Sequence, residues 1–161
     1  ADISLVKQGI EAFHGAGRRF EEKGFCNGAK IMDDYAHHPK EISSAISSIR
    51  NIFPGRKLCG IFQPHLYTRT RDFAPEFAES LSKLDELILL DIYPARELPI
   101  EGVTSEIIFN DVTIENKVLI HKEEVLDTLE TRELDVVITF GAGDIDRLIP
   151  SIKELLQNKT R

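Results

Sequence analysis

Short, nearly continuous apolar runs recur along the chain, separated by longer segments that mix apolar and polar positions. Runs of this length that are rich in Ile, Leu, Val and Phe are typical of strands buried on both faces of a parallel sheet. The sequence predicts such strands at residues 29–32, 57–63, 86–92, 118–121 and 134–140.

The segments between these runs place apolar residues at helical spacing, with polar residues on the opposite side. The pattern predicts amphipathic helices within residues 42–53, 73–84 and 145–156. Alternating strands and helices are typical of an α/β domain. We therefore expect a doubly wound, mostly parallel, Rossmann-like sheet with helices on both faces and right-handed crossovers.

The first residues follow a different pattern. Asp2 can cap a short helix whose apolar positions are Ile3, Val6, Ile10 and Phe13, and the glycines at 15 and 17 end it. Residues 18–22 then favour an extended segment, and the glycines at 24 and 28 favour a turn. We interpret residues 1–15 as the tail of a preceding domain and residues 16–161 as one complete domain.

Composition narrows the class of protein. The 161 residues are 42% hydrophobic and 29% charged, with a net charge of −7, which predicts a folded domain and disfavours a general nucleic-acid surface. Cys26 and Cys59 are too few for a disulfide framework, so we expect free thiols in a reducing cytosol. No apolar run reaches the length of a membrane span, and the amino terminus lacks the layout of a signal peptide. Because the chain starts with Ala1 and not Met, we expect a fragment of a longer protein.

Chemically versatile side chains follow the predicted strands. In a parallel sheet the carboxyl ends of the strands share one edge, where α/β folds bind ligands. The segments that meet there are 33–39 (DDYAHHP), 63–72 (QPHLYTRTRD), 91–97 (DIYPARE) and 141–144 (GAGD). Guanidinium groups at such an edge grip carboxylates or phosphates, which favours a small anionic substrate, and a carboxylate there suits a ribose hydroxyl or an ammonium group.

Each of these residues also has a simpler interpretation. Asp33 or Asp34 could cap the turn that follows, one of the two adjacent histidines could be structural, and Arg71 could pair with Asp72. The glycines at 141 and 143 could form only a tight turn. They are part of neither a dinucleotide fingerprint nor a P-loop.

A metal site is disfavoured. A zinc site built from His37, His38, His65 and an aspartate is conceivable, but adjacent histidines cannot easily aim at one ion from an extended turn. No His-x-x-x-His or Cys-x-x-Cys spacing appears either. We expect no metal to be held by this chain.

Taken together, these motifs resemble the Mur ligases of peptidoglycan synthesis, the cell-wall pathway that supports cell shape and division. The resemblance rests on three motifs in the family's order, and residues 13–20 (FHGAGRRF) are similar to the family's junction between its central and carboxyl-terminal domains. Those motifs are DDYAHHP at 33–39, FQPHLYTRT at 62–70 and DIYPARE at 91–97. Family members have three domains, and the resemblance implies that residues 16–161 are the carboxyl-terminal one. Residues 1–15 would be the tail of the central ATPase domain, which carries the P-loop missing here.

The motifs are most similar to those of the family branch that adds the first amino acid. The resemblance implies an ATP-dependent ligase that joins L-alanine to the lactyl carboxylate of UDP-N-acetylmuramic acid through an acyl phosphate. ATP and Mg²⁺ would be required, with the metal held mainly by the missing central domain. The implied partners are these substrates and the missing amino-terminal and central domains, in the cytoplasm, without nucleic acid or membrane.

The resemblance also implies roles for individual residues. His37 would be catalytic, beside the reacting amine. Tyr35 and His37 would border the alanine and nucleotide pocket, Arg69 would grip the alanine carboxylate, and His65 would support that loop. Arg19 would reach the ATP phosphates, and Asp34 would hold the ATP ribose. Leu66 departs from the basic residue of many members, which leaves Arg69 alone or with Arg71, and Ala36 replaces a common glycine.

Three alternatives remain open. The first is a related Mur ligase that adds a peptide to recycled muramic acid, and Leu66 is the residue that points toward it. The second is a stand-alone flavodoxin-like binding or signalling module such as a receiver, although the last strand ends in glycines and not in the lysine a receiver needs. The third is a pure assembly domain, which would not need so many charged groups at one edge.

Overall fold

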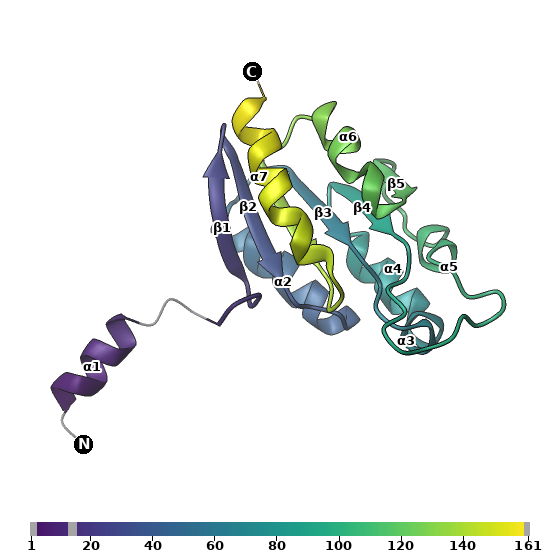
Figure 1. The fold of residues 1–161 in the computed structure, drawn as a ribbon, viewed down its shortest axis with the longest axis horizontal. Helices are drawn as coiled ribbons and strands as arrows, with labels where there is room; N and C mark the ends of the chain where they lie inside the picture. The colour runs from purple at the N-terminus through teal and green to yellow at the C-terminus, as the bar shows by residue number, and fades with distance from the viewer. Residues whose placement is uncertain (1–2, 13–15, 160–161) are drawn as a thin grey trace.

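The computed structural model describes residues 3–12 and 16–159. Within this part of the chain, six strands form one sheet in the order β1-β2-β6-β3-β4-β5 (Figure 1). Strands β2 to β6 run parallel, and β1 pairs antiparallel with β2 at one edge. The bounds are Glu21–Cys26 for β1, Ala29–Asp34 for β2, Leu58–Phe62 for β3, Glu86–Leu90 for β4, Lys117–Ile120 for β5 and Val136–Phe140 for β6. All five predicted strands and the mostly parallel sheet are confirmed.

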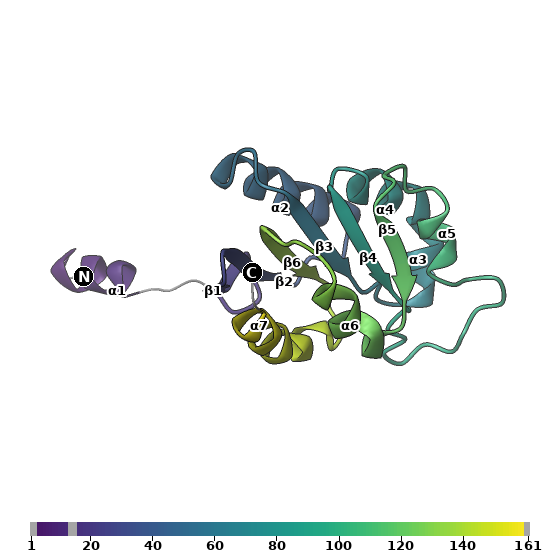
Figure 2. The ribbon, with the colours of Figure 1, turned by 90° about the horizontal axis from the view of Figure 1, so that it is seen from above.

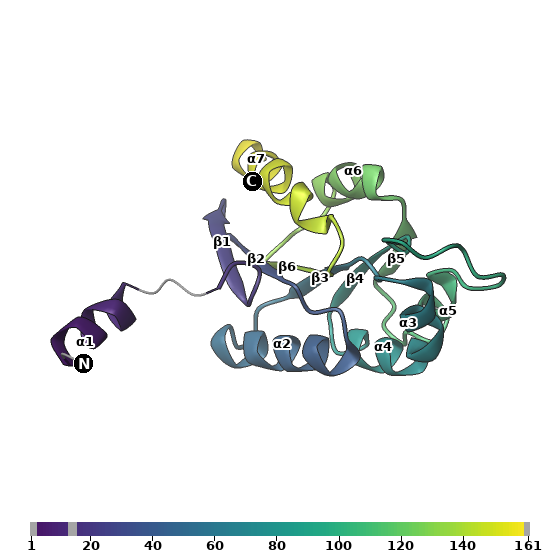
Figure 3. The same ribbon diagram turned by 60° about the horizontal axis from the view of Figure 1, so that its bottom comes forward.

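Helices cover both faces of the sheet, as predicted (Figures 2 and 3). Helices α2, α3, α4 and α5 lie on one face, and α6 and α7 lie on the other. Their bounds are Pro39–Ile52 for α2, Tyr67–Asp72 for α3, Ala74–Leu81 for α4, Glu106–Phe109 for α5, Val125–Glu130 for α6 and Ile149–Asn158 for α7, with 3₁₀ turns η1 at Lys122–Glu124 and η2 at Ile145–Leu148.

The order of the strands explains the two helix layers. The chain moves from β2 to β5 with its helices on one face, then returns through α6 to insert β6 between β2 and β3. A right-handed crossover in the opposite direction places its helix on the opposite face. The sheet is therefore buried between two apolar clusters. One cluster lies between the sheet and helices α2 and α4 and includes Phe62, Phe77 and Phe140. The other lies between the sheet and α7 and includes Ile61 and Ile152.

Strand β1 differs from the prediction. An extended segment was expected at 18–22 and a turn from Gly24, but the strand continues through Gly24 to Cys26. The turn lies at Asn27 and Gly28, which both have positive φ angles, of 49° and 84°. An Asn-Gly pair with this geometry is the strongest short-range signal of a hairpin, and the register shift at Gly24 is a bulge and not a turn.

The helices start and end close to the predicted positions. Pro39 occupies the first turn of α2, where its missing N–H costs nothing, and Glu41 accepts hydrogen bonds from the backbone N–H groups of His37 and His38. The helix expected within 73–84 is α4, which directly follows α3. The helix expected within 145–156 begins as η2 and continues as α7.

The predicted amino-terminal helix is present as α1, Ile3–Glu11. The apolar side chains of Ile3, Leu5 and Val6 are exposed. The expected cap Asp2 and the apolar position Phe13 lie outside the described residues. None of the helices in the described part of the chain is both long and apolar enough to cross a membrane.

Candidate functional site

Four segments meet at the carboxyl edge of the sheet, as the sequence predicts. The backbone of Tyr93, after β4, donates to Pro64 at 2.8 Å and accepts from Leu66 at 3.0 Å, and both of those residues follow β3. The end of β6 joins the end of β2, because the N–H of Gly141 donates to the carbonyl of Asp34 at 3.3 Å. These hydrogen bonds hold the segments together, so the side chains that they carry lie at one continuous edge of the sheet.

Four aromatic and imidazole rings form a row along this edge. Tyr35 and His37 lie edge to face with centroids 5.2 Å apart, and the rings of His37 and His65 are 6.3 Å apart. His65 stacks on Tyr93 at 5.7 Å, with 14° between their planes. The row brings together three predicted site residues, Tyr35, His37 and His65, and adds Tyr93, which follows the next strand.

Arg69 lies beside this row on α3. Its Nη1 approaches Nδ1 of His65 at 3.2 Å and the carbonyl of His65 at 3.4 Å. Because a guanidinium can only donate, Nδ1 of His65 must be the acceptor and the imidazole must be neutral. Burial, and then the charge of Arg69, lower the pKa of His65, which agrees with a neutral ring. Within the described residues, no carboxylate lies at ion-pair distance from Arg69.

His37 has a defined tautomer in its neutral form. Nδ1 lies 3.0 Å from the carbonyl of Tyr35, which can only accept, so Nδ1 carries the proton and Nε2 is left as the basic atom. Glu41 lies 3.6 Å from the same Nδ1 and would stabilise a positive charge on the ring. His38, in contrast, precedes the first residue of α2 and packs against Phe73 at 4.7 Å. One of the adjacent histidines therefore has a structural environment, as the sequence indicated.

Both carboxylate oxygens of Asp34 are used within the domain. Oδ1 accepts from the N–H of Ala36 at 2.7 Å, and Oδ2 accepts from the N–H of Phe20 at 2.8 Å. Burial raises the pKa of Asp34 despite these two bonds. The carboxylate also faces a small hollow of about 320 Å³, which Arg19 and Glu41 help to line.

Arg18, and not Arg19, is the arginine that the fold holds in place. Its Nε donates to the buried carboxylate of Asp33 at 3.2 Å, and its Nη2 and Nη1 reach the carbonyls of Gly141 at 2.6 Å and Gly143 at 3.3 Å. The predicted residue, Arg19, is exposed and lies 5.6 Å from the ring centroid of Tyr35. Adjacent arginines cannot be told apart by sequence alone, and the role of Arg18 was missed for that reason.

The glycines after β6 allow a close approach of three segments. A Cβ on Gly141 would lie 2.8 Å from the carbonyl of Gln63, and Gly141 has a φ of 148°. A Cβ on Gly143 would lie 2.5 Å from Oε1 of Gln63 and 2.7 Å from Cγ of Tyr93. The Gly-Ala-Gly segment is therefore a close-packed turn, and Gln63 and Lys122 both bind Asp144 next to it.

Other predicted residues have structural partners. Asp33 is fully buried and accepts from the hydroxyl of Thr139 at 2.6 Å in addition to Arg18. Arg71 pairs with Asp72 at 2.7 Å, as its simpler interpretation predicted. Within the described residues, no group of three or more His, Cys, Asp and Glu side chains has the arrangement of a metal site. The described residues therefore offer no ligand set for a resident metal ion.

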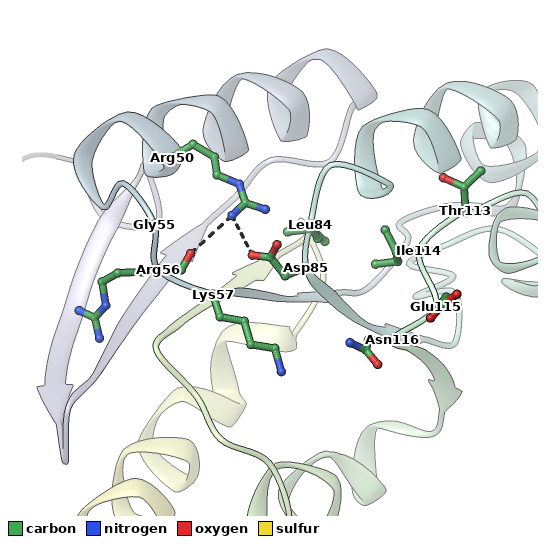
Figure 4. A pocket seen from close by; sticks show the side chains of 10 residues that line it. All are labelled: Arg50, Gly55, Arg56, Lys57, Leu84, Asp85, Thr113, Ile114, Glu115 and Asn116. Carbon is green, nitrogen blue, oxygen red and sulfur yellow. Dashed lines mark hydrogen bonds and ion pairs between the residues drawn. The ribbon is translucent and has the colours of Figure 1, made fainter.

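A second hollow, of about 800 Å³, lies at the opposite, amino-terminal edge of the sheet (Figure 4). Its cationic side chains are already paired: Arg50 binds Asp85 at 2.7 Å, and Lys57 binds the buried Glu86 at 2.9 Å. None of the predicted site residues lines it. The row of rings and the arginines at the carboxyl edge remain the candidate site.

Known proteins resemble this chain over nearly its whole length. The family of the Mur ligase, glutamate ligase domain, matches residues 18–143. A relative from Parabacteroides distasonis, named UDP-N-acetylmuramate--L-alanine ligase, is 54% identical over 156 residues, which are 97% of this chain and 34% of that protein. The chain thus spans about a third of the length of the curated relatives it matches.

Solved structures share the fold. The UDP-N-acetylmuramate-alanine ligase MurC from Thermotoga maritima superposes with a TM-score of 0.77 at 24% identity, over 99% of this chain and 34% of that one. The murein peptide ligase from Psychrobacter arcticus gives 0.75 at 18% identity, over 96% and 33%. The domain match, the high identity to the Parabacteroides protein and the shared fold together place this chain in the Mur ligase family, as its glutamate ligase domain.

Proposed function

We propose that this chain is the carboxyl-terminal domain of a UDP-N-acetylmuramate–L-alanine ligase, spanning residues 16–161, with residues 1–15 as the tail of the central ATPase domain. The full enzyme would join L-alanine to UDP-N-acetylmuramic acid with ATP, in the cytoplasm, during peptidoglycan synthesis. The observation that carries the proposal is the row of rings with Arg69 beside it, at the ligand-binding edge of a domain whose relatives bear that name.

Arg69 is proposed to bind the carboxylate of L-alanine. The guanidinium is half-buried, its orientation is held by His65, and no carboxylate of the described residues forms an ion pair with it. A guanidinium with unused donors can grip a carboxylate through two parallel hydrogen bonds. Arg71 is less suited to share this role, because Asp72 already occupies it.

His37 is proposed to take a proton from the alanine ammonium group. An amine attacks a carbonyl carbon only in its neutral form, and Nε2 of His37 is the basic atom of a ring that Tyr35 orients. Glu41 would then stabilise the imidazolium. Tyr35 and His65 border the same space and would limit the access of water to an acyl phosphate.

Arg19 and Asp34 are proposed to contact ATP. Arg19 is exposed and free to turn toward a phosphate, and Asp34 faces the hollow beside it. Asp34 accepts one hydrogen bond at each oxygen from a backbone N–H group, and its remaining lone pairs are available to a ribose hydroxyl. Arg19 and Asp34 would not bind the Mg²⁺ that accompanies ATP, which would be held mainly by the central domain of the full enzyme.

A ligase that adds a peptide is the second candidate. It would share this domain and differ in the pocket for the incoming amine, where Leu66 stands beside the Arg69 loop. The two candidates predict different acceptors, so one experiment separates them.

The test uses the full-length protein with ATP and UDP-N-acetylmuramic acid, and offers L-alanine, glycine, L-serine or the tripeptide as the amine. We expect phosphate release and a new amide product, detected by mass spectrometry, with L-alanine at the highest kcat/KM. Preferred use of the tripeptide would refute the proposal in favour of the second candidate. The isolated chain should neither hydrolyse ATP nor form the amide, because it has no P-loop.

A further inference from the structure

Glu97 connects two loops that carry parts of the candidate site. It follows β4, in the loop that contains Tyr93, and its side chain reaches the start of α3. Oε2 accepts from the backbone N–H of Thr68 at 3.0 Å, and Oε1 accepts from the hydroxyl of Thr68 at 2.5 Å. Bonding from the hydroxyl of Thr68 is the main cause that lowers the pKa of Glu97, so the side chain is a carboxylate at neutral pH.

Helix α3 needs such an external partner. The residue before its first turn, Leu66, has no side chain that can cap the helix, and it has a φ of 74°, in the left-handed region that disfavours a leucine. A residue persists in this region only when its surroundings fix it. The N–H of Leu66 donates to Tyr93 at 3.0 Å, and its carbonyl accepts from the hydroxyl of Thr70 at 2.8 Å.

The consequence reaches Arg69, which is one residue after Thr68. The direction of its guanidinium depends on α3 and on His65, and the loop after β4 restrains both of them: Glu97 restrains α3, and Tyr93 stacks on His65. Each oxygen of Glu97 accepts one hydrogen bond from Thr68, so the carboxylate is fixed against the start of α3.

We infer that Glu97 is a positioning residue for the amino-acid carboxylate: it holds the start of α3 so that Arg69 is aimed before the substrate arrives. This inference rests on the proposed function and adds a residue to it. Because Arg69 is already oriented before L-alanine binds, none of the binding energy is lost in ordering its side chain.

The test measures KM for L-alanine, KM for ATP and kcat in the full-length ligase, together with the melting temperature. We expect Glu97→Ala to raise KM for L-alanine about tenfold, which corresponds to about 1.4 kcal/mol, and to leave KM for ATP within about twofold. Glu97→Gln, which keeps one acceptor oxygen, should recover part of the loss. Arg96→Ala, in the same loop with an exposed side chain, is the matched control and should change neither KM.

A double mutant shows whether Glu97 acts through Arg69. If it does, adding Glu97→Ala to Arg69→Ala should raise KM for L-alanine no further, because residues in one chain of contacts are not additive. Independent, additive effects would overturn the inference, as would equal increases of both KM values. If Glu97→Ala does not fold, Thr68→Val carries the same test, since it removes one of the two bonds and keeps the backbone donor.

Different results would overturn the proposed function and the role of Glu97. A wild-type enzyme that did not consume L-alanine would overturn the proposed function and this inference with it. An active wild-type enzyme whose KM for L-alanine was unchanged in both Glu97→Ala and Thr68→Val would overturn the inference alone.

Discussion

Replacing Arg18 by alanine should destabilise the domain far more than the same change at Arg19. Arg18 is the only partner in the described residues that brings positive charge to the carboxylate of Asp33, which is fully buried. Removing one member of a buried ion pair leaves the other charge uncompensated, at a cost of about 3–5 kcal/mol. The side chain of Arg18 is 21% exposed, so water can replace part of the loss, and we expect the lower end of that range.

The bonds of Arg18 to two carbonyls support this magnitude. They join the start of β1 to the turn after β6, two segments more than 120 residues apart in the chain, as the separations of 123 and 125 show. For a domain of this size, a loss of about 3 kcal/mol should lower the melting temperature by about 6–12 °C. Arg19→Ala removes an exposed side chain and should change the free energy of unfolding by less than about 0.5 kcal/mol.

The assay is urea unfolding of the isolated domain, followed by circular dichroism, with thermal melts of the same variants. Arg18→Lys should recover little, because an ammonium group cannot span the carboxylate and both carbonyls. Asp33→Asn in the Arg18→Ala background should restore part of the stability by removing the uncompensated charge. Equal stability of the Arg18→Ala and Arg19→Ala domains would refute the reasoning, as would a double variant less stable than Arg18→Ala.

Three further predictions concern the site. Arg69→Ala should raise KM for L-alanine far more than KM for ATP, because it removes a charge-assisted contact worth about 1.5–3 kcal/mol. Arg69→Lys should recover only part of the lost affinity for L-alanine. An unchanged KM for L-alanine in Arg69→Ala would mean that another group binds its carboxylate. In an NMR titration, His65 should protonate below the ordinary value of about 6.5 because burial lowers its pKa. His121 should protonate above that value because the hydrogen bond that it donates to Asp91 raises its pKa. The contribution of His65 to stability should therefore be complete above about pH 6.5 and decline as the pH falls below that value. The contribution of His121 should be present below about pH 6.5 and be lost as the pH rises through its raised pKa. A titration midpoint of His65 above that of His121 would contradict both assignments. Asp34→Asn should weaken the use of ATP by the full enzyme. It should also destabilise the isolated domain by about 1–3 kcal/mol, because one of the two backbone N–H groups that bind Asp34 loses its acceptor. Weaker use of ATP without any loss of stability would show that those two hydrogen bonds do not stabilise the domain.

The sheet could be predicted because its strands are buried on both faces. A strand such as β6 is apolar at every position except Thr139, and no competing pattern explains that run. Strand β1 could not be recognised in the same way. It is an edge strand with the sequence EEKGFC, its side chains are mostly partly exposed, and Gly24 suggested a turn where the chain forms a bulge.

The candidate site was predictable in its location but not in all of its contacts. The motifs after β2, β3 and β4 had to meet because parallel strands share their carboxyl edge, and the ring row of Tyr35, His37 and His65 follows from that. The choice between Arg18 and Arg19 and the bond from Glu97 to Thr68 depend on side-chain directions over long sequence separations. Periodicity and motif spacing carry no information about those directions.

The burial of Cys59 provides the domain with an internal reporter of its own opening. The thiol lies in the apolar layer under α7, and burial raises its pKa to about 12. Only on the order of 10⁻⁵ of such thiols are ionised near pH 7, and the thiolate is the species that alkylating reagents attack. Labelling of Cys59 therefore requires that the sheet and helix layer separate, so the rate of alkylation in native buffer measures how often the core of this domain opens.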